Sequence, residues 1–286
     1  MSGIHWLVSY PKSGNTWMRV FLANLTGEGS GPVSINELET GGIASARGLF
    51  DDLTGVEASE LREEEIERLR PRVYGKFSSE LKAEGDCRFV KVHDAWTLLD
   101  DGAPLFPSVG RVLYIIRNPL DVAVSYAHFR ACPMDEIIRQ MGDREAALCQ
   151  KPDRLHLQLR QRLLSWSGHV RSWVDRSGMP LEVIRFEDMK SAPLETFERA
   201  VRFLGLDASR ERILRALEYS SFDELRGQEE AAAFRERGRG KVFFRRGEVG
   251  AWRDELTPDQ VRRILSDHQA VMARFGYLPS DWSTES

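Results

Sequence analysis

The chain has 286 residues, of which 42% are hydrophobic, 29% charged and 9% aromatic. This length suits one large α/β domain or two small ones, and the composition excludes a disordered, collagen-like or coiled-coil chain. The formal net charge is -4 at pH 7, so no overall positive field attracts nucleic acid or an anionic membrane. Any anion site must therefore be built locally, and we expect no nucleic-acid partner.

Cysteine and histidine spacing bears on the compartment and on metals. The three cysteines, Cys87, Cys132 and Cys149, have no CxxC spacing, and the six histidines show no HExxH or HxH pattern. This argues against a disulfide framework and a metal site, and it indicates a reducing compartment. The first apolar run is too short for a secretory signal, and no window has the roughly 18 apolar residues of a membrane helix. We expect a cytoplasmic protein without a membrane span or a metal.

The N-terminal half alternates short apolar runs with amphipathic stretches, and Pro11 and Gly14 end the first run. The predicted elements in chain order are a strand at residues 4–9, a helix at 16–25, loop with short helical pieces at 29–57, a charged helix at 59–69, strands at 88–92 and 111–116, and a helix from Pro119 to about Phe129.

The C-terminal half continues the alternation. Its predicted elements are a long amphipathic helix at 157–174, a strand at 181–186, a helix at 194–204 and a helix that ends at 275. Thr257 and Gln260 form a capping box at the start of the last helix, with Pro258 at its first position. Strands that alternate with helices predict one α/β domain over residues 1–286, with a central parallel β-sheet flanked by helices.

The segment YPKSGNTW, residues 10–17, joins the first predicted strand to the first predicted helix. A loop there directs backbone N–H groups and a helix N-terminus at one point, which predicts an anion site. Lys12 adds a charge, and Ser13, Asn15 and Thr16 add donors. The segment is not a Walker A loop, because its lysine precedes the glycine. A plain turn capped by Thr16 would explain Gly14, but not Lys12 or Trp17.

Lys91 and His93 stand at the carboxyl end of the second predicted strand, where open α/β sheets bind ligands. Period-two alternation puts both on the same side of that strand. Histidine is the side chain best suited to proton abstraction near neutral pH. A lone histidine at a strand end is more often structural, so this pair gains weight only beside the other segments.

Two later segments offer further cations. Arg117 follows the strand at 111–116, and Ser125 lies two turns into the next helix; together they suit a phosphate, although Arg117 could instead pair with Asp121 as a capping salt bridge. The segment FFRRGEVGAWR, residues 243–253, describes a loop that can wrap a second anion through Arg245, Arg246 and Gly247. The preceding basic stretch, with Arg235, Arg237 and Arg239, has the composition of a solvated loop. Several separated cationic segments imply a ligand with more than one anionic group.

These segments resemble the motifs of cytosolic-type sulfotransferases, the family that uses 3'-phosphoadenosine 5'-phosphosulfate (PAPS). YPKSGNTW is similar to the family's YPKSGTTW loop, and YIIRNPLDVAVSYAHF to its RNPxDxxxSxxxF motif. KVH matches the KxH that carries the family's catalytic histidine, and RRGEVGAWR is similar to its late RKGxxGDWK. The resemblance implies a P-loop-like nucleotide-binding architecture and, as substrates, PAPS and a small-molecule acceptor, with PAP as a product.

The resemblance also implies a role for each matched residue. His93 would be the general base, Lys91 would steady the transferring sulfuryl group, and Lys12 would stabilise the leaving PAP. The implied nucleotide contacts are Lys12, Ser13, Gly14, Asn15 and Thr16 for the 5'-phosphosulfate; Arg117, Ser125, Arg245, Arg246 and Gly247 for the 3'-phosphate; and Trp17, Phe222 and Ser220 for adenine.

Two alternatives to sulfuryl transfer are a P-loop-fold kinase that uses Mg-ATP and a non-catalytic module that binds PAP. The resemblance places the acceptor, with its hydroxyl or amine, among variable insertions at 29–82 and 130–157. Apolar residues there suggest a pocket for a hydrophobic alcohol, phenol or natural product, although they could equally be core; the oligomeric state stays open. The apolar residues are Leu49, Phe50, Leu53, Met134, Ile137 and Met141.

Overall fold

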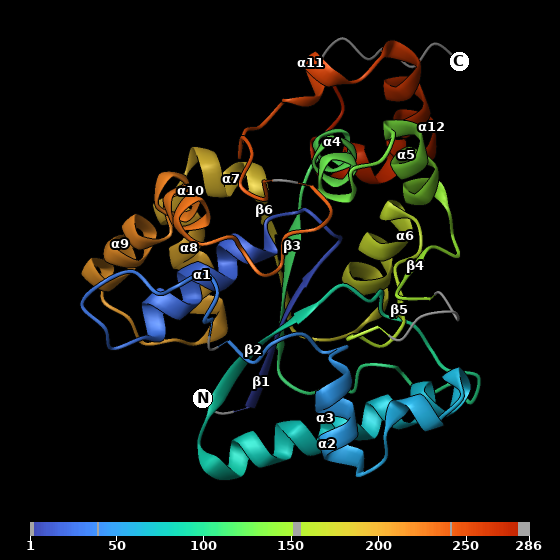
Figure 1. The fold of residues 1–286 in the computed structure, drawn as a ribbon, viewed down its shortest axis with the longest axis vertical. Coiled ribbons are helices and arrows are strands. Elements are labelled where there is room, and N and C mark those ends of the chain that lie inside the picture. The colour runs from blue at the N-terminus through green and yellow to red at the C-terminus, as the bar shows by residue number, and fades with distance from the viewer. Residues whose placement is uncertain (1–2, 39, 151–155, 241, 280–286) are drawn as a thin grey trace.

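The computed structural model describes residues 3–38, 40–150, 156–240 and 242–279 (Figure 1). Within these ranges the centre is a four-stranded sheet in the order β2–β1–β3–β6, and each neighbouring pair is parallel. A separate antiparallel ribbon pairs β4 with β5. The predicted central parallel sheet is therefore confirmed. The strands are Gly3–Ser9 (β1), Cys87–Val92 (β2), Arg111–Ile116 (β3), Ala147–Leu148 (β4), Gln161–Arg162 (β5) and Leu181–Arg185 (β6).

Strand β1 lies inside the sheet, and all seven of its residues are buried. Its side chains alternate between two cores, because Trp6 and Val8 pack on one face of the sheet and Leu7 packs on the other. Strands covered on both faces are near-continuous apolar runs, as β1 and β3 are. The strands predicted at 4–9, 88–92, 111–116 and 181–186 coincide with β1, β2, β3 and β6 to within one residue at each end.

The described ranges also contain short and long helices. They are α1 (Asn15–Thr26), α2 (Arg47–Thr54), a 3-10 turn (Ala58–Glu60), α3 (Glu63–Glu84), α4 (Pro119–Arg130), α5 (Met134–Gly142), α6 (Trp166–Arg171), a π-helical turn (Ser172–Arg176), α7 (Phe186–Ser191), α8 (Pro193–Leu204), α9 (Arg210–Tyr219), α10 (Phe222–Ala231), α11 (Trp252–Glu255) and α12 (Pro258–Arg274).

Helices cover both faces of the sheet (Figure 1). The core on the Leu7 face is completed by α1, α8 and α9, and the core on the Trp6 face by α3, α4, α5, α6 and α12. A smaller cluster joins α1 to α10 through Val20 and Leu225, with Phe234 and Phe244 packed between them. No helix in the described ranges is both long enough and apolar enough to span a bilayer.

The predicted helix at 157–174 is wrong over its first half. Residues 161 and 162 pair as β5 with β4, and Leu164 has a positive φ of 59°, which a helix cannot contain. Arg162 is held there by an ion pair with Glu67 at 2.7 Å. The helix begins only at Trp166, where the Ser165 side chain accepts the N–H of Gly168. Tertiary pairing has therefore overridden an apolar periodicity.

The predicted charged helix at 59–69 starts and ends too early, because α3 begins only at Glu63 and continues through Pro71 to Glu84. Arg70, 1% exposed, forms a buried ion pair with Asp94 at 2.9 Å and donates to the Tyr74 hydroxyl. These tertiary contacts hold the chain helical on both sides of the proline. Helices α5, α9 and α10 occupy stretches for which no helix is predicted.

The helix starts signalled by caps are confirmed. The Asn118 side chain accepts from the Leu120 N–H at the start of α4, and Thr257 and Gln260 form the reciprocal capping box of α12. The strand register places the carboxyl ends of β1, β2 and β3 together, because Val8 pairs with Val92 and Ser9 with Ile115. Of the expected acceptor segment at 130–157, residues 151–155 lie outside the described residues.

Candidate active site

A cavity of about 1350 Å³ opens at the carboxyl ends of the strands. Single small-molecule sites are usually about 300–1,000 Å³, so this volume leaves room for two ligands. The predicted site residues line it, with the exception of Ser13 and Ser220. Those that line it are Lys12, Gly14, Asn15, Thr16, Trp17, Lys91, His93, Arg117, Ser125, Phe222, Arg245, Arg246 and Gly247.

The loop between β1 and α1 is held in an unusual backbone conformation. Lys12 has a φ of 68° and Gly14 a φ of 106°, and a Cβ on Gly14 would lie 2.8 Å from the Phe186 ring. Asn15 fixes the helix start to the strand, because its Nδ2 donates to the Leu7 carbonyl at 2.8 Å. The loop therefore requires glycine at position 14 and presents the N-terminus of α1 to the cavity.

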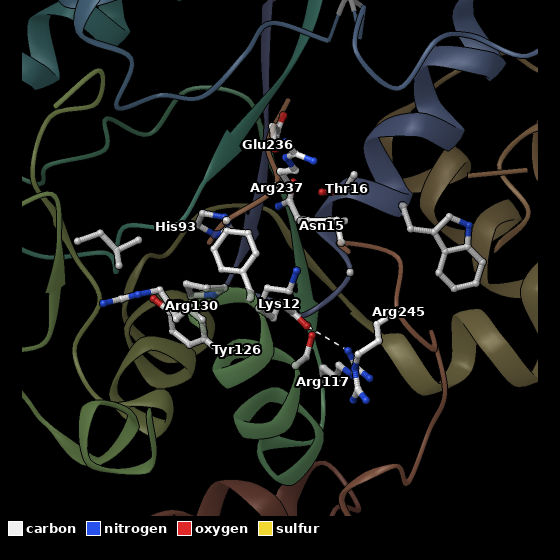
Figure 2. Close-up of a pocket in the computed structure, with 18 of the residues that line it drawn as sticks. Lys12, Asn15, Thr16, His93, Arg117, Tyr126, Arg130, Glu236, Arg237 and Arg245 are labelled. Carbon is white, nitrogen blue, oxygen red and sulfur yellow. Dashed lines mark hydrogen bonds between the residues drawn. The ribbon is translucent and has the colours of Figure 1, made fainter. Parts of the chain in front are cut away.

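Lys12 lies in an apolar setting. Its Nζ is 3.6 Å from the ring centroid of Phe243 and 4.4 Å from that of Phe129. Burial, and after it the charges of Arg117 and Lys91, lower the pKa of Lys12 to about 7. An ammonium in this setting is stabilised by any anion that binds beside it. In Figure 2 it lies between His93 and the Arg117–Arg245 end of the cavity.

His93 follows the last residue of β2 and lies beside the end of β1. Its Nδ1 is 2.8 Å from the Ser9 carbonyl oxygen, which only accepts hydrogen bonds, so Nδ1 carries the proton and Nε2 keeps its lone pair. Burial, and next the charge of Lys91, lower the pKa of His93 to about 3. The ring is therefore neutral near pH 7 and presents a base to a cavity that it lines.

Lys91 is held by Glu236, a residue that the sequence did not predict. One Glu236 oxygen lies 2.8 Å from Lys91 Nζ, and the other lies 2.6 Å from Arg19 Nη1 on α1. Burial acts to raise the pKa of Glu236, but the charges of Lys91 and Arg19 lower it to about 2. The three side chains form one charged cluster at the cavity wall.

Arg117 is 8% exposed and lines the cavity. Its Nη2 donates to the Glu248 carbonyl at 2.9 Å, and its guanidinium lies 4.2 Å from the Phe186 ring. Its Nε is buried without a partner in the described chain. The capping salt bridge with Asp121 does not form; Asp121 accepts instead from the backbone N–H groups of Gly250 and Trp252. Arg117 thus keeps a donor for a ligand.

The loop at 243–253 closes the other wall. Gly247 has a φ of 61°, and a Cβ there would lie 2.5 Å from the Phe222 ring. Arg245 is paired with Glu255 at 2.7 Å, and Arg246 lies 3.6 Å from Asp254. These contacts hold the two arginines at the same end of the cavity as Arg117.

The aromatic pair predicted for adenine is present at one end of the cavity. Trp17 and Phe222 both line it, and the Lys190 ammonium lies 5.6 Å from the first ring and 5.7 Å from the second. Ser220 lies apart from them, fully buried, and donates to the Ala216 carbonyl at 2.7 Å. Trp17 Nε1 is buried and has no partner in the described residues.

The strap, residues 232–240, crosses the C-terminal end of α4. A Cβ on Gly238 would lie 2.3 Å from the Phe129 carbonyl oxygen, and the Gly240 N–H donates to that oxygen at 3.1 Å. The close approach requires glycine at 238. The strap arginines, Arg235, Arg237 and Arg239, are exposed, as a solvated loop predicts, and they also line the cavity.

The lining of the cavity combines charged residues at α5 with apolar residues that include Val124, Ala147 and Leu148. Helix α5 turns Ile137 and Met141 into the core, while Glu136, Arg139 and Asp143 line the cavity. None of the six apolar residues considered for a pocket wall lines the cavity. Phe50, Ile137 and Met141 are buried in the core, Leu53 and Met134 pack against it partly buried, and Leu49 is half-buried. The i, i+3, i+7 spacing of the charged face could have predicted the charged lining at α5.

A protein-family model described as a sulfotransferase domain matches residues 4–276. That range contains every predicted site residue. Among curated proteins, the chain is similar to Sulfotransferase 2A1 of Rattus norvegicus, with 28% identity over 183 residues that cover 60% of each chain. The chain thus spans about 60% of the length of that relative. It is also similar to Sulfotransferase 1A1 of Canis lupus familiaris, with 25% identity over 291 residues that cover 94% of this chain and 83% of that protein.

Solved structures show the same fold. Mouse sulfotransferase SULT7A1 complexed with PAP superposes with a TM-score of 0.57 at 21% identity, covering 94% of this chain and 84% of that one. Retinol dehydratase in complex with androsterone and PAP gives a TM-score of 0.58 at 19% identity, covering 99% and 82%. The predicted P-loop-like α/β architecture is confirmed.

Proposed function

Because the chain is a member of the sulfotransferase family, we propose that it transfers the sulfuryl group of PAPS to a hydroxyl or amine of a small-molecule acceptor. The observation that carries this proposal is the pairing of a neutral histidine base with two lysines at the end of one sheet. His93 Nδ1 is engaged by the Ser9 carbonyl, so Nε2 is the ring nitrogen left with a lone pair, on a residue that lines the cavity together with Lys12 and Lys91.

The chemistry of the donor set fits a nucleotide with two anionic groups. At one anionic end the Phe129 and Phe243 rings lie beside the Lys12 ammonium, and at the other Arg117 has a buried Nε without a partner in the described residues. Any Cβ at position 247 would lie 2.5 Å from the Phe222 ring, so the glycine keeps that part of the cavity open. Lys12 with the loop residues 13–16 would hold the 5'-phosphosulfate, and Arg117, Ser125, Arg245 and Arg246 the 3'-phosphate. Trp17 and Phe222 are proposed for adenine, and Ser220 is not, because it is buried away from the cavity and its hydroxyl donates to the Ala216 carbonyl.

The nucleotide supplies an activated sulfuryl group, and the chain supplies position and charge. His93 Nε2 accepts the proton of the attacking hydroxyl, since the ring is neutral near pH 7. Lys91 is oriented by Glu236 and donates toward the transferring group, and Lys12 stabilises the charge that develops on the departing nucleotide.

The acceptor side of the cavity combines charged and apolar residues. Glu136, Arg139 and Asp143 line the cavity and are exposed, and Val124, Ala147 and Leu148 line it as well. An acceptor with an apolar body and a few polar groups would suit such a mixed lining. We therefore favour a small-molecule acceptor of mixed polarity that carries the reacting hydroxyl or amine.

The three free thiols accord with a cytoplasmic site of action.

The test is calorimetric titration with PAP in the absence of metal, beside a titration with Mg-ATP. We expect PAP to bind, and Arg117→Ala to weaken binding by about 10- to 100-fold, the worth of a hydrogen-bonded charge. Arg144→Ala is the matched control, because Arg144 is exposed and does not line the cavity.

Activity is then tested with His93→Gln, which should bind PAP like the wild type and transfer no sulfuryl group. A preference for Mg-ATP would contradict the proposal in favour of a kinase. PAP binding together with no sulfated product from a broad pool of acceptors would favour the non-catalytic module.

A further inference from the structure

Glu236 is the acidic member of the cluster at the cavity wall and comes from none of the predicted motifs. Its two oxygens bridge Lys91 on β2, at 2.8 Å, and Arg19 on α1, at 2.6 Å. Arg19 is 4% exposed, and its Nε also lies 3.4 Å from the Thr40 hydroxyl. Three segments far apart in the sequence thus meet at one carboxylate.

The strap holds that carboxylate in place from both sides. Two residues before it, Phe234 is 1% exposed and packs with Val20 and Leu225. Two residues after it, Gly238 lies against the Phe129 backbone. With both neighbours fixed, the Glu236 side chain has little freedom to leave Lys91. Figure 2 shows Glu236 among the residues around Lys12 and His93.

The charge of Glu236 is needed because cations otherwise crowd this part of the site. The groups facing Lys91 are Glu236, Arg19, Lys12 and the neutral His93. Burial lowers the pKa of Lys91, and the charge and hydrogen bond of Glu236 oppose that change. An ammonium that is buried without a counter-charge has a lower pKa and gives up its proton more readily.

Resting on the sulfuryl transfer proposed above, we propose that Glu236 is a positioning residue that keeps the Lys91 ammonium charged and aimed at the transferring group. An ammonium has three donors. One is directed at Glu236, which fixes the side chain, and two are left for sulfuryl oxygens. Glu236 itself touches no reacting atom; it acts through Lys91.

The experiment compares full-length wild type with Glu236→Gln in a transfer assay over pH 6 to 10. Loss of a charged hydrogen bond predicts a fall in kcat of at least about tenfold, with the KM for PAPS changed less than about threefold. The alkaline limb of kcat should move at least about one pH unit lower, because Lys91 then loses its proton more readily. Glu230→Gln is the matched control, since Glu230 forms only an exposed pair with Arg226.

Two further variants make the assignment specific. Glu236→Asp restores the charge, so its alkaline limb should stay within about half a pH unit of the wild type. In a Lys91→Arg background the lysine no longer titrates, so Glu236→Gln should leave the limb where it is. The proposal is overturned if Glu236→Gln leaves the alkaline limb of kcat unmoved. It is also overturned if Glu236→Asp shifts the limb as far as Glu236→Gln does, or if Glu236→Gln shifts it equally in the Lys91→Arg background.

Failure of this inference is distinct from failure of the proposed function. A wild type that neither binds PAP nor sulfates any acceptor contradicts the sulfotransferase proposal. A wild type that does both, with a Glu236→Gln variant that matches it in kcat and pH profile, removes only the positioning role of Glu236.

Discussion

Binding of PAP should change the protonation of Lys12. Burial, together with the charges of Arg117 and Lys91, lowers the pKa of this ammonium to about 7, and the Phe129 and Phe243 rings lie beside it. An anionic group placed beside it acts in the opposite direction and raises the pKa. Nucleotide binding above pH 7 should therefore take up a proton, and PAP affinity should fall as the pH rises above 7.

The size of the effect follows from that pKa. With a pKa of about 7, Lys12 is about nine-tenths protonated at pH 6 and about one-tenth protonated at pH 8. If a bound anion restores an ordinary lysine pKa of about 10.4, binding takes up about 0.9 proton at pH 8 and about 0.1 at pH 6.

The number of protons is measured by titrating PAP in buffers of different ionisation enthalpy, where it is the slope of the observed enthalpy. Lys12→Arg is the control, because a guanidinium keeps the charge and does not titrate in this range. Uptake below about 0.3 proton at pH 8 would refute the reasoning. Uptake that persists in the Arg variant would assign the proton to Lys91, whose pKa burial also lowers.

Two other predictions concern nucleotide affinity and stability. Gly247→Ala should weaken PAP binding about tenfold or more, because its Cβ would lie 2.5 Å from the Phe222 ring. Gly55 also has a positive φ but faces open space, so Gly55→Ala is the control and should leave PAP binding unchanged. Equal PAP affinities of the Gly247→Ala variant and the wild type would contradict the proposed role of Gly247. Asp94→Asn should lower the free energy of unfolding in urea by about 3–5 kcal/mol, since it removes the counter-charge of buried Arg70; a fall below about 1 kcal/mol would contradict this.

The position of the site could be predicted from the sequence because its residues follow apolar runs. Lys12, His93 and Arg117 each come just after a strand, and parallel strands end at the same edge of a sheet. The proximity of these three residues follows from the parallel sheet alone and needs no further long-range contact to be predicted. The same holds for the helix starts, which depend on caps a few residues long.

What could not be predicted depends on distant partners. Glu236 lies 145 residues from Lys91 and 217 from Arg19, and nothing near it in the sequence separates it from a solvated acid. The apolar periodicity at 157–174 indicated a helix and did not indicate that β5 pairs with β4. Helix α3 passes Pro71 because Arg70 is held by Asp94, 24 residues along the chain.

The spread of these residues along the chain also has a consequence for biosynthesis. Lys12 and Arg245 line one cavity, yet they lie 233 positions apart in the sequence. At about 5–20 residues per second, a ribosome takes roughly 10 to 50 s to add that stretch. Throughout that interval the nascent chain has the loop at residues 10–17 without the opposite wall of the cavity. The nucleotide proposed above would therefore support folding only after the 243–253 loop has emerged, when it acts by mass action on a chain that is almost complete.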